Sequence, residues 1–104
     1  MAGITQSTVE AALDSSSAFG WTPEGRHTGK FVISKDSVPL GRAVRVVGAG
    51  VTAYDFDGAQ VGPIVASLYA AGLALEGELV RRRAVGQIDS IVAQAVVVAA
   101  EIGV

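Results

Sequence analysis

The chain has 104 residues, of which 50% are hydrophobic and 17% are charged, and its formal net charge is −2. This length suits one domain with one core, over residues 1–104, and the low share of charged residues argues against a disordered chain. Cysteine is absent, which excludes disulfides, thiolate metal sites and a cysteine nucleophile, and the acidic balance argues against a nucleic-acid partner.

The N-terminal segment is predicted to form a helix after a short flexible lead-in, residues 1–4. Ser7 and Glu10 have the spacing of a capping box, which places the start of the helix at Ser7. Gly20 is expected to end the helix, because glycine is common just after helix C-termini. The serine run 15–17 weakens this pattern, so an extended arm through residue 20 that orders only on a partner stays an alternative.

A small antiparallel sheet is predicted for residues 30–57. The strongest signal is a hairpin, because residues 42–47 and 51–56 are rich in β-branched side chains and flank Gly48-Ala49-Gly50. A preceding strand is expected over residues 30–35. Two segments that contain glycine and proline are predicted as turns: Trp21–Gly29, and Asp36–Gly41 with Pro39 inside it.

The pattern then changes to a helical period. Pro63 is expected at the first helical position, where its missing N–H costs nothing. Gly86 separates a last apolar segment, residues 88–102, which fits a helix, although Val96-Val97-Val98 also fits a buried strand. The whole chain therefore predicts an α+β fold with an N-terminal helix or arm, the sheet, and two C-terminal apolar segments that we expect to be helical. The first of these has one apolar stripe: Ile64, Leu68, Ala71, Leu75 and Leu79.

One motif has the spacing of a dinucleotide-binding turn. Gly48, Gly50 and Ala53 match the pattern G-x-G-x-x-A after a strand-like run. Such a site needs a helix to begin at the motif, because the first N–H groups of that helix bind the pyrophosphate. The residues that follow, 54–58, are poor helix formers. We therefore favour a hairpin turn, keep Gly48 and Gly50 only as the cofactor-binding alternative, and expect no cofactor.

Asp55, Asp57 and His27 are the candidates for catalysis or ligand binding. Asp55-x-Asp57-Gly58 has part of the pattern of a calcium loop, but position twelve of that loop is Ala66 and not glutamate, so no metal site is expected. His27 is the only histidine and could act as a general base, because its pKa lies near neutrality. The structural alternatives are a solvated turn for the two acids and a surface position for the histidine.

Arg81, Arg82 and Arg83 form the one cluster of positive charge. Successive helical residues point about 100° apart, so we interpret the run as favourable cations at a helix C-terminus and not as a phosphate-binding patch. The apolar residues exceed what a chain of this size readily buries, and exposed apolar patches usually mark interfaces. The residues expected at such an interface are Trp21, Leu68, Leu75 and Val97.

These observations favour a non-enzymatic structural or assembly protein that forms a symmetric homo-oligomer, such as a shell or capsid-associated component of a virion. Two alternatives stay open. One is a small enzyme or ligand-binding protein with a site at a subunit interface near His27, Asp55 and Asp57, and the other is an adaptor module that binds another protein. The sequence has neither a signal-peptide pattern nor a membrane-spanning run. We therefore expect no membrane partner, and a place in the cytoplasm or in an intracellularly built assembly.

Overall fold

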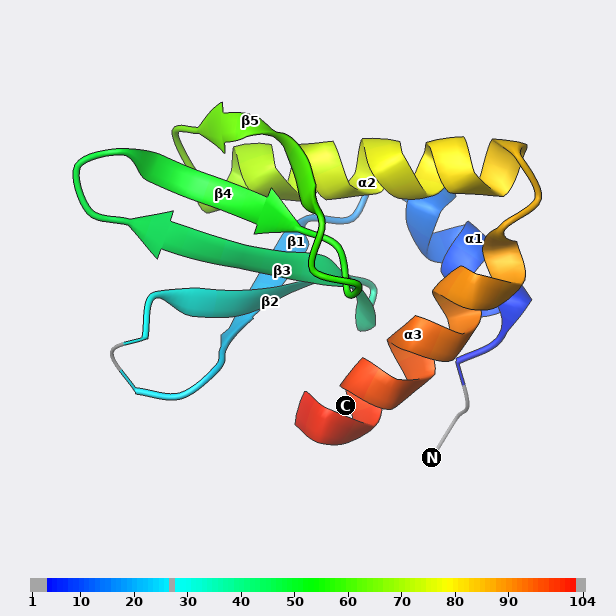
Figure 1. The fold of residues 1–104 in the computed structure, drawn as a ribbon. Helices are drawn as coiled ribbons and strands as arrows, with labels where there is room; N and C mark the ends of the chain where they lie inside the picture. The colour runs from blue at the N-terminus through cyan, green and yellow to red at the C-terminus, as the bar shows by residue number, and fades with distance from the viewer. Residues whose placement is uncertain (1–3, 27, 103–104) are drawn as a thin grey trace.

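The computed structural model describes residues 4–26 and 28–102 (Figure 1). Within these residues, a five-stranded sheet with the order β1-β2-β3-β4-β5 has one helix before it and two helices after it. All neighbouring strands are antiparallel. The predicted α+β class is confirmed, as are the N-terminal helix and the helical state of both C-terminal segments. The elements are α1 (Gln6–Asp14), β1 (Phe19–Pro23), β2 (Lys30–Lys35), β3 (Val38–Val46), β4 (Gly50–Tyr54), β5 (Gln60–Val65), α2 (Leu68–Ala84) and α3 (Ile88–Ile102).

α1 begins and ends at residues other than those that the capping pattern predicts. Thr5, and not Ser7, is the N-cap, since its hydroxyl accepts a hydrogen bond from a backbone N–H of the first turn at 3.3 Å. The helix ends at Asp14, well before Gly20, because Ser15 adopts an extended backbone. The hydroxyl of Ser15 accepts a hydrogen bond from the backbone two residues later, and such local bonds compete with helical ones.

β1 occupies part of the segment that was predicted as a turn-rich connection, so this prediction is wrong for residues 21–23. β1 pairs with β2 in regular register, with Trp21 opposite Ile33. Pro23 is tolerated because it is the last residue of an outer strand. Pairing with β2 therefore outweighs the turn propensity of glycine and proline in this segment.

The turn between β2 and β3 is shorter than predicted. It consists of Asp36 and Ser37, whose φ angles of 50° and 66° suit a two-residue type I′ hairpin turn. Pro39 lies inside β3, opposite Ser34, where the pairing of β2 and β3 shifts its register. Because an irregularity in the ladder tolerates a missing N–H, β3 can begin earlier than the sequence indicates.

The predicted hairpin is confirmed. β3 pairs with β4 across a connection formed by Val47, Gly48 and Ala49. Gly50 opens β4 with a φ of +121°. A Cβ atom at Gly50 would lie 2.4 Å from the backbone oxygen of Val65 in β5, so the close approach of β5 requires glycine at this position.

α2 begins later than predicted, because residues 60–65 pair with β4 and form β5. Pro63 therefore lies in a strand at the sheet edge, which tolerates proline, and is not the first helical residue. Ser67 caps α2, and its hydroxyl accepts a hydrogen bond from the backbone N–H of Ala70 at 3.1 Å. Ile64 is exposed on β5. The rest of the predicted stripe is buried, namely Leu68, Ala71, Leu75 and Leu79.

The core lies between the sheet and the helices. α2 runs along the sheet, and α1 and α3 gather at one end of it (Figure 1). At Gly72 of α2, an added Cβ atom would lie 2.9 Å from ring carbons of Phe19, so this glycine brings α2 close to β1. No helix in the described ranges is long and apolar enough to span a membrane. The core cluster draws on all three helices and the sheet, with Val9, Leu13, Ile33, Leu40, Leu75 and Ile91 among its members.

Candidate functional site

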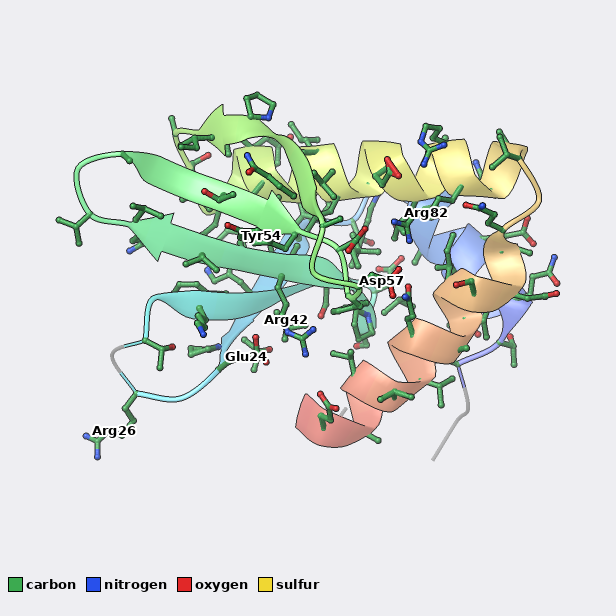
Figure 2. All side chains as sticks on the ribbon, viewed as in Figure 1. Glu24, Arg26, Arg42, Tyr54, Asp57 and Arg82 are labelled. Carbon is green, nitrogen blue, oxygen red and sulfur yellow. The ribbon has the colours of Figure 1, made fainter. Side chains whose placement is uncertain are left out.

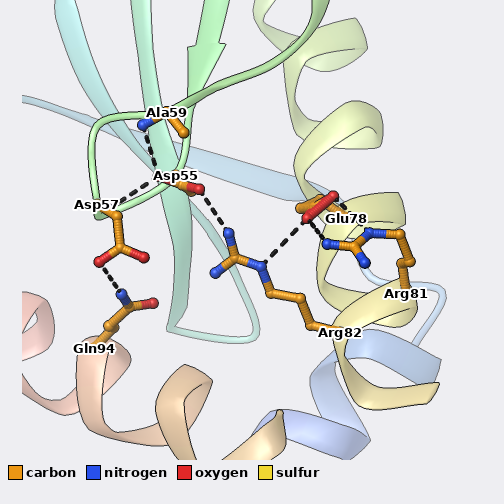
Figure 3. Close-up of polar contacts among 7 residues, drawn as sticks. All are labelled: Asp55, Asp57, Ala59, Glu78, Arg81, Arg82 and Gln94. Atoms are coloured by element: carbon orange, nitrogen blue, oxygen red, sulfur yellow. Dashed lines mark hydrogen bonds and ion pairs between the residues drawn. The ribbon is translucent and has the colours of Figure 1, made fainter. Parts of the chain in front are cut away.

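The two acids that follow β4 belong to a set of polar contacts that we call the Arg82 network (Figure 3). It consists of Asp55, Asp57, Glu78, Arg82 and Gln94. Arg82 donates from Nη2 to Oδ2 of Asp55 at 2.6 Å and from Nε to Oε1 of Glu78 at 3.3 Å. The Oδ1 atom of Asp55 accepts two backbone N–H groups of the β4–β5 turn, at 2.9 and 3.0 Å. Asp57 accepts a hydrogen bond from Nε2 of Gln94, on α3, at 2.8 Å.

The Arg82 network ties the β4–β5 turn to α2 and α3. The side chains of Asp55 and Arg82 are only 7% and 13% exposed, and both oxygens of Asp55 already accept hydrogen bonds from the chain itself. Within the described part of the chain, no three side chains converge as metal ligands. Asp55 and Asp57 thus have the contacts of structural residues, which connect the β4–β5 turn to α2 and α3. His27 lies outside the described residues, so its association with these acids stays a prediction.

The three arginines of the predicted cluster all pair with carboxylates of the chain itself. Arg81 and Arg82 both contact Glu78, and Arg83 contacts Asp14 of α1 at 3.0 Å. All three lie in the last turn of α2, where cations are favourable. The hydrogen bond from Arg81 is the main reason that the pKa of Glu78 lies below its ordinary value of 4.5. The three arginines therefore form ion pairs at the position that was predicted for them, as cations at a helix C-terminus.

Another polar cluster surrounds Arg42 of β3 (Figure 2). Arg42 donates to Glu24 at 3.0 Å, lies 3.6 Å from a carboxylate oxygen of Glu101, and stacks on the ring of Phe56 at 5.1 Å. Arg42, Phe56 and Glu101 border a hollow of about 340 Å³ that Val97 of α3 also lines. Val97, one of the residues predicted at an interface, is exposed. The contact between Arg42 and Glu101 links the C-terminal part of α3 to the sheet.

Gly48 and Gly50 lie at the rim of a wide, largely apolar hollow of about 720 Å³, which we call the Trp21 groove. β4 begins at Gly50, so no helix N-terminus follows these glycines, as a dinucleotide site would require. The groove lies between β1, the β3–β4 turn and the start of α2, with Trp21 and Tyr69 among its lining residues. At the tip of the turn, the side chain of Val47 is 99% exposed.

Phe19, Gly20 and Trp21 of β1, together with Tyr69 and Leu73 of α2, form a surface that we call the β1 edge surface. Trp21 is 44% exposed and Tyr69 is 56% exposed. The rings of Phe19 and Tyr69 meet edge to face, with centroids 5.7 Å apart. Besides the Trp21 groove, hollows of about 400 and 280 Å³ border this strand. Exposed aromatic residues beside an outer strand are features of protein interfaces.

The structure separates the residues that were predicted at an interface. Trp21 and Val97 are exposed, whereas Leu68 and Leu75 are buried and belong to the core cluster. Sequence reasoning missed Tyr69 and Leu73. Their spacing of four residues places them on one face of a helix, and this face differs from that of the buried stripe, so a second apolar stripe was the available signal.

A comparison with models of protein families, with curated proteins and with solved structures finds no match to this chain.

Proposed function

We propose that this protein is a non-enzymatic assembly component that forms a symmetric homo-oligomer, and that the β1 edge surface is its main contact. The observation that carries this proposal is the combination of two exposed aromatic side chains, Trp21 and Tyr69, with an outer strand. Monomeric proteins usually protect such edges with charge or cover them, because an open edge pairs with other chains. Here β1 has the sequence Phe-Gly-Trp-Thr-Pro, without a charged residue.

A larger assembly such as a shell needs a second contact that differs from the first, because a two-fold contact alone closes as a dimer. Val96 and Val97 of α3 are large apolar side chains that are exposed on another element. In this proposal they form the second contact. The occupied oxygens of Asp55 support a structural role over catalysis at the predicted acids.

Light scattering on a gel-filtration column, at loading concentrations from micromolar to millimolar, tests this function. The mass of one chain is 10.6 kDa. The proposal predicts a mass that is a defined multiple of this value, and a Trp21→Ser variant with a reduced mass at the same concentration. A mass of one chain at every concentration would contradict it.

A second candidate function is an adaptor that binds a peptide of another protein. The Trp21 groove favours it, because the groove is lined by apolar side chains and has Arg45 at its rim. Arg45 also lies over the ring of Phe31, 5.6 Å from the centroid. This candidate predicts a monomer that binds apolar peptides with an acidic residue, measured as a change in Trp21 fluorescence. An oligomer whose Trp21 emission does not respond to such peptides would exclude it.

A further inference from the structure

β1 is the outer strand of the sheet, so one side of its backbone has no neighbouring strand among the described residues. Just beyond β1, the backbone N–H of Glu24 donates to a carbonyl oxygen at the start of β2, at 2.9 Å. Hydrogen-bonded positions alternate along an antiparallel strand. Gly20 and Thr22 therefore bond to β2, and Phe19 and Trp21 direct their N–H and C=O groups outward.

The opposite edge of the sheet, β5, is unsuited to pairing with another chain. Pro63 lies in the middle of β5, and Gly62 has a φ of +71°. The register between β4 and β5 also shifts. Proline and irregular geometry are devices that block edge-to-edge association. β1 has neither device in its centre, so it is the edge that remains open.

We propose that a second copy of this chain pairs its β1 antiparallel to β1, across a two-fold axis that passes Gly20. This inference rests on the proposed function and names the contact that would produce it. In this register, Phe19 lies opposite Trp21 of the second copy, and the symmetry repeats the pair. Both residues direct their N–H and C=O groups outward, so each pair can exchange two hydrogen bonds. β1 of the second copy thus satisfies the N–H and C=O groups that β1 of the first copy leaves unpaired.

The positions of Gly20 and Pro23 in β1 explain why we place the axis at Gly20. The two copies of Gly20 would face each other as a pair without hydrogen bonds, with Cα atoms about 4.5 Å apart. No atom lies within 4 Å of a Cβ built on Gly20, so a side chain added at this position would meet no other group of its own chain. An axis at Trp21 would place Pro23 opposite Phe19 in two symmetry-related pairs, and each pair would lose one donor, because proline has no N–H.

The side chains on this edge supply apolar area for the contact. Trp21 and Tyr69 expose about half of their surface, and an aromatic side chain can bury about 150–250 Å². The four rings of two copies thus offer roughly 400 Å², against the ~1,200 Å² that a stable interface needs. The paired backbones, Leu73 and Pro23 must supply the rest. A contact of this size predicts a dimer that dissociates on dilution.

Cysteine cross-linking tests the register, and the absence of native cysteine makes the test clean. We expect Gly20→Cys to form a disulfide-linked dimer under mild oxidation, because two Cα atoms about 4.5 Å apart suit a disulfide. Thr22→Cys is the matched control on the same face of β1. Its two copies would lie about 13 Å apart along the strands, so it should stay uncross-linked. Faster cross-linking of Thr22→Cys, or none by either variant, would overturn the inference.

A charge at the axis tests the contact itself. Gly20→Lys would place two ammonium groups across the two-fold axis, and we expect the dissociation constant to rise at least about tenfold. Gly77→Lys, at an open glycine on α2, is the control and should associate like the wild type. If Gly20→Lys associates like the wild type, assembly does not use this pairing. This inference then fails together with the β1 edge surface as the main contact, whereas the formation of a homo-oligomer stands. If the wild type is a monomer at every concentration, the proposed function fails as well.

Discussion

Replacing Gly72 with alanine tests how closely α2 packs on β1. Gly72 is buried in α2, and an added Cβ atom would lie 2.9 Å from two ring carbons of Phe19. Gly77, in the same helix, is exposed and has no atom within 4 Å of such a Cβ. The two substitutions therefore add the same methyl group to one helix in opposite environments.

The expected magnitudes follow from this contrast. In a helix interior, alanine is more favourable than glycine by about 0.5–1 kcal/mol, so Gly77→Ala should stabilise the protein by that amount. Gly72→Ala gains the same propensity, but it must displace the Phe19 ring, and overpacking a core costs about 1–3 kcal/mol. The Tm of Gly72→Ala should therefore lie at least about 4 °C below that of Gly77→Ala.

Thermal unfolding followed by circular dichroism measures this difference. Both variants must be compared at one protein concentration, because association raises the apparent Tm. Equal stabilisation by the two substitutions would refute the packing of α2 against Phe19. It would also mean that the contact between α2 and Phe19 does not hold β1 in its position.

Three further changes test other parts of the fold. Gly50→Ala should lower the free energy of unfolding, measured by urea denaturation, by more than about 2 kcal/mol. The reason is that alanine would have to adopt a positive φ and its Cβ atom would clash with the backbone of β5. An unchanged free energy of unfolding would contradict the close approach of β5. Arg82→Ala should cost about 2–4 kcal/mol of stability, because it leaves Asp55 buried without its partner. Arg81 is exposed, so Arg81→Ala should cost less than about 1 kcal/mol. Equal costs for the two variants would argue against the Arg82 network. The lowered pKa of Glu78 predicts a stabilising contribution that is present above pH 4.5 and is lost as the pH falls below that value. Glu78→Gln should therefore flatten the acid limb of a stability–pH profile, and an unchanged limb would exclude this cause.

The helices and the central hairpin could be predicted because their signals are local. The stripe of Leu68, Ala71, Leu75 and Leu79 has a helical period, and Gly48 and Gly50 lie where a hairpin must turn. β1 and β5 could not be predicted in this way. Each is a short strand with glycine and proline in it, and pairing with β2 or β4 is what holds it extended.

The candidate site depends on contacts between residues that are distant in the sequence. Asp55 meets Arg82, 27 positions later, so its residue type alone could not distinguish a free turn carboxylate from a buried ion pair. Leu68 and Leu75 were predicted at an interface because their stripe is apolar, but the same stripe covers the sheet. The exposed side chains of Tyr69 and Leu73 lie on another face of α2. Only the packed structure shows which apolar face is left uncovered.

Hydrogen exchange at single backbone amides, measured by NMR at several protein concentrations, tests the central claim most directly. The amides of Phe19 and Trp21 point outward from β1 in one copy, so they should exchange fast when the protein is dilute. We predict that their protection rises with concentration in parallel with the mass from light scattering, because pairing of β1 with β1 engages them. Exchange at these two amides that stays fast while the mass exceeds that of one chain would contradict the account.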